Sequence, residues 1–357
     1  MANFTGTLNA NEIYAALFNM IISQEVFADN ITVSNRLVDK ARTEGSLYGD
    51  TKLYYSVDVL KSRKWGADND TNVLELHRTK SPECQAIVLD QFFQIALTND
   101  YYLSKRAWGT EGAFVSFNSV TLGMIRNTKD IIDSTTYNSF IGTTISEIGK
   151  QNQEWAISDE IGNAEGMEKN QLQATSIARH LADLIVELTD NSRDYNDYGH
   201  MRQYTKDMIK VVWNSKWYNQ IRKVDLVTIF HKEGIIDKFD SDTLPPRFFG
   251  AVNAEDGTTT SSNTTVRSLI EKDYGDKHLF PGDLLPNSTE YLAGETYTED
   301  PDILCKVVIK YPPFMSAFET GTSFFNPRSL TENHYLTWGR NTLEYLKNYP
   351  FITVHID

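Results

Sequence analysis

The feature that most constrains the fold is a long amphipathic segment that opens at about Glu111. Apolar residues recur on one helical face from Ala113 to Ile131, while polar side chains such as Lys129 lie off that face. A helix that continued to about Phe140 would be about 40 Å long at 1.5 Å per residue. A small globule rarely needs such a rod, so this segment favours a flat, elongated subunit.

The rest of the chain mixes helical and extended patterns, which indicates the α+β class. The clearest helix has an apolar stripe from Leu172 to Leu188. Asn214 and Ser215 could cap another helix, and Asp225 could begin a third. Strands are expected at Asp207–Trp213, Ile303–Tyr311, Ser329–Tyr345 and Phe351–Ile356. The segment Phe239–Asp300 is expected to be rich in loops, with an exposed excursion at Thr258–Thr265.

Two β-forming stretches, Lys52–Leu60 and Thr71–Arg78, predict a long two-stranded ribbon whose turn is the polar cluster Gly66–Asp70. An isolated hairpin is marginal in water, so such a ribbon needs something outside it to pack against. The dense apolar run Glu83–Thr98 fits a helix or a strand, and its β-branched and aromatic content favours a strand.

The N-terminal stretch carries apolar residues at helical spacing, and their face also needs a partner, in the same chain or in a neighbouring one. These residues are Ile13, Leu17, Phe18, Ile21 and Ile22.

The charge balance excludes some classes of function. The 357 residues hold 34 Lys and Arg against 48 Asp and Glu, a formal net charge of −14. Proteins that grip nucleic acid or anionic lipid present a basic face, which this composition argues against. Two cysteines, Cys84 and Cys305, form no disulfide framework and are expected to be buried thiols. The beginning of the chain does not have the pattern of a signal peptide, and no apolar run is long enough for a bilayer, so a reducing cytosol is the expected site of synthesis.

A search for catalytic and ligand motifs finds none. There is no GxGxxG, GxxxxGK[ST] or HExxH pattern, the seven histidines show no ligand spacing, and Asp68–Asp70 lacks the rest of a calcium loop. We therefore expect no catalytic residue, no cofactor and no metal. The aromatic content of 12% is expected to serve cores and interfaces.

The sequence resembles the major capsid proteins of short-tailed DNA bacteriophages, the podophage group that includes phi-twenty-nine-like viruses, which share the Hong Kong 97 shell fold. Three stretches carry the resemblance: Ala113–Phe117 leading into Thr135–Phe140, like the family's spine helix; Val211–Tyr218 through Val224–Leu226, like its axial strand and helix; and Asn326–Leu330 through Tyr335–Trp338 to the closing strand. The order of elements across nearly the whole chain is the stronger signal, because no single motif is specific.

The resemblance implies a layout of four parts. Residues 1–44 would form an N-terminal arm, and residues 45–82 an extended β-hairpin loop that overlaps a neighbouring subunit. Residues 83–150 and 321–357 would form the peripheral domain with the spine helix. Residues 151–320 would form the axial domain.

The implied function is structural: an icosahedral bacteriophage head subunit that self-assembles into pentamers and hexamers, in the virion, after synthesis in the host bacterial cytoplasm. Scaffolding protein and portal would be assembly partners, and double-stranded DNA would be enclosed without strong specific binding. No membrane partner is expected. The expected intersubunit contacts are Tyr54, Tyr55, Val57, Val59, Leu74, Leu76, Ile13 and Leu17.

Three alternatives stay open from the sequence. One is an encapsulin-type non-viral shell of the same fold, which the nucleic-acid content of purified particles would distinguish. The second is a soluble α+β enzyme with an unrecognised site, which would be monomeric with a deep pocket. The third is a phage portal or tail component, which would show ring symmetry.

Overall fold

A computed structural model describes residues 37–44, 51–62, 76, 78–100, 111–146, 148–228, 240–253, 259–260, 272–274, 277–279 and 297–357. Its described residues fall into two compact units. Unit 1 draws on residues 1–50, 89–134 and 315–341, and unit 2 on residues 51–88, 135–314 and 342–357.

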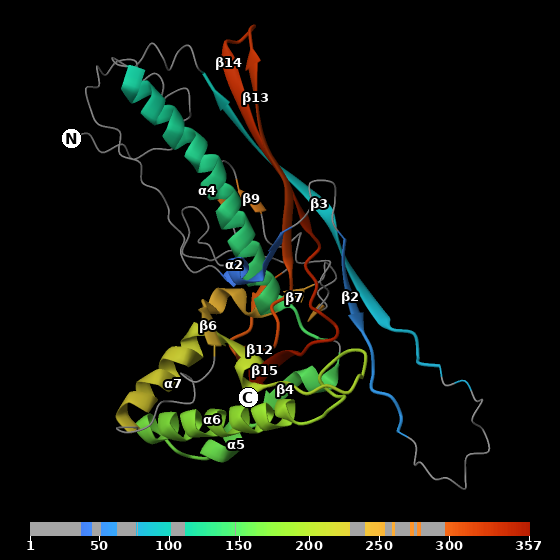
Figure 1. Cartoon of the computed structure of the whole chain (residues 1–357). Coiled ribbons are helices and arrows are strands. Elements are labelled where there is room, and N and C mark those ends of the chain that lie inside the picture. The colour runs from blue at the N-terminus through green and yellow to red at the C-terminus, as the bar shows by residue number, and fades with distance from the viewer. Residues whose placement is uncertain are drawn as a thin grey trace. The chain divides into compact units, whose positions relative to one another are not determined.

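Unit 2 is built on a five-stranded sheet in the order β4-β15-β12-β5-β6 (Figure 1). Central β12 is antiparallel to both of its neighbours, and the outer pairs β15–β4 and β5–β6 are parallel. The strands are β4 (Asn152–Trp155), β5 (Lys210–Asn214), β6 (Asp240–Leu244), β12 (Ile303–Val308) and β15 (Phe351–Ile356). Every residue of β12 is buried, Lys306 among them, as expected of a strand covered on both faces.

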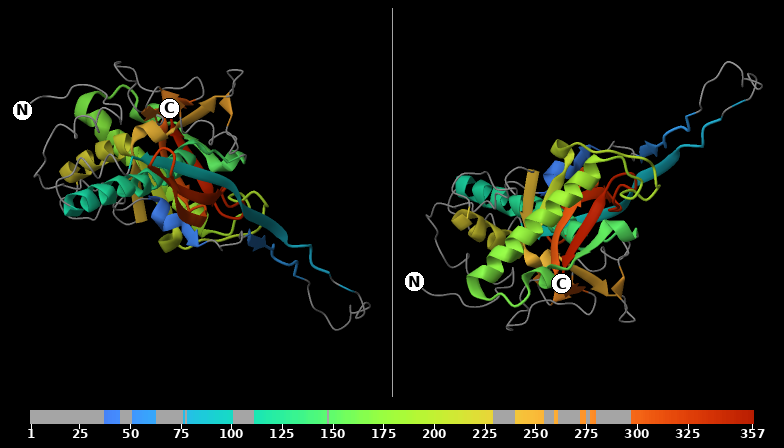
Figure 2. Two further views of the ribbon diagram at one scale, coloured as in Figure 1. Left: turned by 90° about the horizontal axis from the view of Figure 1, so that it is seen from above. Right: turned by 90° about the horizontal axis from the view of Figure 1, so that it is seen from below.

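Helix α6 (Gly166–Thr189) supplies much of the cover for this sheet. Its stripe of Ile177, Leu181, Leu184 and Leu188 belongs to one buried cluster with Trp213, and Figure 2 (right) shows α6 lying across the sheet. The stripe predicted from the sequence is therefore confirmed as a core face.

Shorter elements complete unit 2. Helix α5 (Ile157–Ile161) is capped by the side chain of Asp357, whose Oδ1 accepts the backbone N–H of Ile157 at 2.7 Å and of Ser158 at 3.0 Å. Helical turns lie at η1 (Gly149–Gln151), η2 (Lys206–Met208) and η4 (Pro246–Phe248). Between Phe239 and Asp300, expected to be loop-rich, lie β7 (Gly250–Asn253), β8 (Thr259–Thr260), β9 (Lys272–Tyr274), β10 (Lys277–Leu279) and β11 (Tyr297–Glu299).

Helix α7 (Ser215–Thr228) corrects one prediction. The sequence suggested that one helix ends and another begins at Asp225, but α7 runs through Asp225 without a break. Aspartate is common at helix N-termini, but it also fits inside a helix when its side chain extends to solvent. The local sequence could therefore not show whether a new helix begins at this residue.

Unit 1 contains most of a second sheet, which has the order β1-β13-β14-β3-β2. Figure 1 shows β3, β13 and β14 as long, twisted strands. They are β1 (Arg42–Glu44), β2 (Thr51–Ser56), β3 (Glu83–Asn99), β13 (Phe314–Asn326) and β14 (Thr331–Asn341). The strand predicted at Glu83–Thr98 is confirmed as β3.

Strand β3 has two successive partners. Residues from Leu89 to Asn99 pair with β14, and residues from Glu83 to Val88 pair antiparallel with β2. The predicted ribbon is corrected in part, because β2 ends at Ser56 and pairs with the start of β3. Of the predicted second strand, Thr71–Arg78, only Leu76 and Arg78 are described. Leu76 and Arg78 lie in no strand, and the predicted turn Gly66–Asp70 lies outside the described residues.

The long helix is confirmed as α4 (Glu111–Thr143), with 33 residues. In unit 1 it carries two buried charged side chains: Lys129, which the pattern had placed off the apolar face, and Asp133. Lys129 Nζ lies 3.5 Å from Asp133 Oδ2 and 3.1 Å from Glu319 Oε2 on β13. Burial raises the pKa of Asp133, whereas the positive charges of Lys129 and Arg42 lower it. Arg42 directly follows the short helix α2 (Leu37–Ala41).

The buried stripe of α6 yields a first prediction. Leu181 is 1% exposed, so Leu181→Asp places an unpaired charge in the core and should lower the free energy of unfolding by at least about 3 kcal/mol. Val186→Asp is the matched control, because Val186 on the same helix is 61% exposed. Urea unfolding of both variants checks this. Equal stability of the two would show that the stripe is not core.

A second prediction concerns Gly142 on α4. A Cβ atom built there would lie 1.9 Å from the carbonyl oxygen of Phe248, a backbone atom that cannot rotate away. Gly142→Ala should therefore destabilise unit 2 by about 1 to 3 kcal/mol. Gly123→Ala, on the same helix with open space around its Cβ position, should instead be neutral or slightly stabilising. Thermal melting of the pair checks the contrast, and a stable Gly142→Ala would contradict the close approach.

Candidate interaction surface

Strand β2 and the segment after it present two different faces, because successive side chains of an extended chain point to opposite sides. On one side a row of apolar side chains is open to solvent. We call it the outward row: Leu53, Tyr55, Val57 and Val59 are 51%, 63%, 59% and 56% exposed. The side chains between them, at Tyr54, Ser56 and Asp58, point the other way and are held by unit 2.

The partner strand widens the outward row into a two-stranded face. Leu53 lies opposite Ala86, Tyr55 opposite Cys84, and Thr51 opposite Val88. Val88 is 48% exposed and Cys84 is exposed. The prediction of two buried thiols is thus wrong for Cys84 and right for Cys305, since an alternating strand places Cys84 on the side opposite buried Gln85 and Ile87.

The first anchor on the inner side is Tyr54. Lys310 Nζ lies 5.4 Å from the centre of the Tyr54 ring and 5.9 Å from that of Tyr349, so the ammonium group lies near two aromatic rings. Burial raises the pKa of the Tyr54 hydroxyl.

The second anchor is Ser56, which is 2% exposed. Its hydroxyl donates to Asn348 Oδ1 at 2.6 Å and accepts from Arg202 Nη2 at 2.9 Å. His200 Nδ1 lies 2.6 Å from the same oxygen. Since the only hydroxyl proton is given to Asn348, Nδ1 of His200 must be the donor. Arg202 also donates to the carbonyl oxygen of Val57 at 2.8 Å, which fixes the backbone as well.

The third anchor is Asp58. Its Oδ2 accepts from Arg193 Nη1 at 2.6 Å, and its Oδ1 accepts the backbone N–H of Met201 at 3.0 Å. The hydrogen bond from Arg193 holds the pKa of the Asp58 carboxyl far below its usual range, with help from the Met201 amide. The carboxylate therefore stays charged and bonded throughout the neutral range.

The anchors and the outward row together define what this surface can do. Three successive inner side chains fix the strand to unit 2, so the apolar row stays exposed and cannot fold back. Burying one such side chain contributes about 1.5 to 3 kcal/mol. A contiguous exposed apolar face of this kind marks a site of protein association.

The structure places the predicted contact residues as follows. Tyr55, Val57 and Val59 lie in the outward row, and Leu76 is 80% exposed. Tyr54 lies on the inner side. Ile13, Leu17 and Leu74 lie outside the described residues. Their contact with a neighbouring subunit remains a prediction. The exposed apolar residues Leu53, Leu60 and Val88 were missed. Only Leu53 alternates with Tyr55, so the pattern could have indicated that residue alone.

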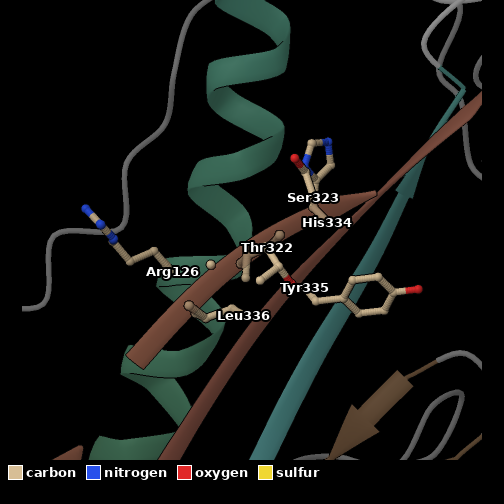
Figure 3. A pocket seen from close by; sticks show the side chains of 8 residues that line it. Arg126, Thr322, Ser323, His334, Tyr335 and Leu336 are labelled. Carbon is tan, nitrogen blue, oxygen red and sulfur yellow. The ribbon is translucent and has the colours of Figure 1, made fainter. Parts of the chain in front are cut away.

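Unit 1 contains a hollow between α4, β13 and β14. It has a volume of about 240 Å³ and is lined by Ile125, Arg126, Gly321, Thr322, Ser323, His334, Tyr335 and Leu336. Figure 3 shows Arg126 and Tyr335 pointing in different directions from α4 and β14, so the polar groups do not converge as catalytic groups must. Among the described residues no group of three acidic, histidine or cysteine side chains could hold a metal. No described helix is long and apolar enough to span a membrane.

Comparison with known proteins identifies the fold. No family model and no curated protein matches the sequence. Among solved structures, the capsid structure of Staphylococcus phage Andhra matches with a TM-score of 0.61 and 10% identity, over 93% of this chain and 87% of that chain. The structure of the head fiber and inner core protein gp22 of native bacteriophage P68 matches with a TM-score of 0.62 and 11% identity, over the same shares. The predicted α+β fold of the Hong Kong 97 capsid type is confirmed.

The anchors yield a third prediction. Arg202→Met removes the bonds to Ser56 and Val57, so hydrogen exchange in a peptide spanning Lys52–Leu60 should become about tenfold faster, equivalent to about 1.4 kcal/mol. The fold should survive, because Arg202 is only half-buried. Arg126→Met on the exposed face of α4 is the control. Unchanged exchange in Arg202→Met would show that this network does not hold the strand.

Proposed function

We propose that this chain is the major capsid protein of a DNA bacteriophage, a structural protein rather than an enzyme. The single observation that carries the proposal is the outward row: a fixed, exposed apolar strand on a chain that has a capsid-type fold. No described part of the chain covers this strand, and a second molecule would complete its burial. A second copy is the partner that a shell supplies at every position.

The layout expected from the resemblance forms part of this proposal. The segment at 45–82, which includes β2 and the outward row, is the loop that overlaps a neighbour. The region at 151–320 is the axial domain, arranged around the axes of pentamers and hexamers. The regions at 83–150 and 321–357 form the peripheral domain, and residues 1–44 the arm. We place the protein with the short-tailed phages on its resemblance to that group.

The charge of the chain supports a passive relation to the genome. With a net charge of −14, a wall of these subunits would bind double-stranded DNA weakly, which allows the genome to enter and leave. Scaffolding protein and portal are the expected partners during assembly. The virion is the proposed location.

The outward row yields the fourth prediction. The double variant Tyr55→Asp, Val57→Asp puts two charges on an exposed face, so the subunit should stay folded while the yield of closed particles falls at least tenfold. Negative-stain electron microscopy measures particles, and circular dichroism measures folding. Met167→Asp, at an apolar position of α6 that is 70% exposed, is the matched control.

Each outcome of this experiment has a meaning. Particles at normal yield from the double variant would remove the outward row from the interface. A wild-type chain that stays monomeric at high concentration would overturn the shell function itself. Particles that hold no nucleic acid when purified from infected cells would favour a non-viral shell.

A further inference from the structure

The centre of unit 2 holds a lysine that the shell function does not use. Lys306 lies on β12, and its side chain is completely buried. Its Nζ donates to the carbonyl oxygen of Thr144 at 2.9 Å and to Thr353 Oγ1 at 2.7 Å. Among the described residues no carboxylate lies within ion-pair distance of this nitrogen. Both acceptors are neutral, so they do not offset the desolvation of an ammonium ion.

Burial is the main cause that lowers the pKa of Lys306, to about 7. The surroundings account for this direction. On β5, the residue paired with Lys306 is apolar Val212. The Phe351 ring of β15, 5.7 Å from Nζ, attracts the ammonium form and so opposes the effect of burial. Near neutral pH the buried amine therefore changes its charge, whereas an exposed lysine keeps its proton to about pH 10.

A second base shares the sheet with Lys306. His355 lies on β15 two residues after Thr353, and therefore on the same face of that strand. Burial lowers the pKa of His355, and the charge of Lys306 lowers it further. The acids nearby act on the histidine in the opposite direction: Asp300, whose Oδ2 lies 3.7 Å from His355 Nδ1, then Glu154 of β4 and Asp302.

The remaining ionisable neighbour is Cys305 on β12, whose pKa burial raises, so it stays a neutral thiol. The cluster thus contains two bases whose positive charges repel each other, and the Asp300 carboxylate favours the protonated form of both. We propose that Lys306 and His355 form a proton-responsive pair in the central sheet of unit 2, which is most stable when both are neutral and weakens as they take up protons.

The direction follows from proton linkage. Between pH 7 and 10.5 the unfolded chain holds a proton at Lys306 that the folded chain lacks, so stability rises with pH across that window and is lost as pH falls through it. His355 acts lower down: its folded pKa lies below 6.5, so its contribution is lost as pH falls below 6.5. Unit 2 should be least stable in acid and gain stability from neutral to alkaline pH.

Hydrogen exchange of the full-length chain between pH 5 and 9, corrected for the intrinsic rate, tests this pair. Peptides from β12 and β15 report on unit 2, and a peptide from β14 is the internal reference in unit 1. In the wild type, protection of β12 and β15 should rise by up to tenfold per pH unit from pH 7 to 9, while β14 changes little.

Two variants and one control assign the effect. Lys306→Met should abolish the rise between pH 7 and 9, whereas Lys169→Met, at an exposed lysine of α6 in the same unit, should keep it. His355→Gln should remove only the dependence below pH 6.5. A wild-type profile in which β12 and β15 do not differ from β14 overturns the proposal, and that arm requires no variant to fold. A Lys306→Met profile that matches the wild type also overturns it.

Discussion

The proposed association depends on one short strand, β2, whose two faces have opposite roles. On β2 the inner side chains satisfy their polar groups against unit 2, and the outer side chains have no cover from the described part of the chain. Neither the anchored inner side chains nor the exposed outer ones would be enough for association by themselves. An apolar strand without anchors could collapse onto its own subunit, and an anchored polar strand would have no reason to associate. Joining the two in alternate positions produces an exposed surface that is also rigid, so that less conformational freedom is lost on binding.

The anchors that hold β2 rigid are positioned by the sheet of unit 2. Asn348, which accepts from both Ser56 and Arg202, lies just before β15, and Lys310 lies just after β12. The two central strands of that sheet therefore lead directly to the residues that hold β2. A change in the stability of β12 and β15 would reach these anchors through the backbone itself, without a separate pathway of contacts. Lys306 lies on β12, so a change in its charge would act on a strand that leads to these anchors.

Sequence patterns predicted the elements whose signal is local. The apolar spacing of α4 and α6 and the continuous apolar run of β12 each fix a face or a length by themselves. The partner of β2 could not be found this way, because strand pairing depends on distant residues and Thr71–Arg78 has as good an alternating pattern as Glu83–Val88. The burial of Lys129 and Asp133 was also beyond reach, since a charged residue on a helix is normally solvated. The outward row lay between these cases: the candidates were named, but only the anchors at Ser56 and Asp58 show which side faces out.

The same reasoning explains why the fold is recognisable when the sequence is not. Identities of 10% and 11% accompany agreement over 93% of the chain, which means that very few side chains are fixed by the fold itself. A core requires apolar residues of suitable total volume at the right period, and it tolerates wide exchange among them. The interfaces of a shell are under a different constraint, because each surface must fit a copy of itself and both sides can change together. Sequence similarity is therefore lost both in the core and at the interfaces, while the order and length of strands and helices are retained. A chain of this kind is better compared by the arrangement of its elements than by its residues.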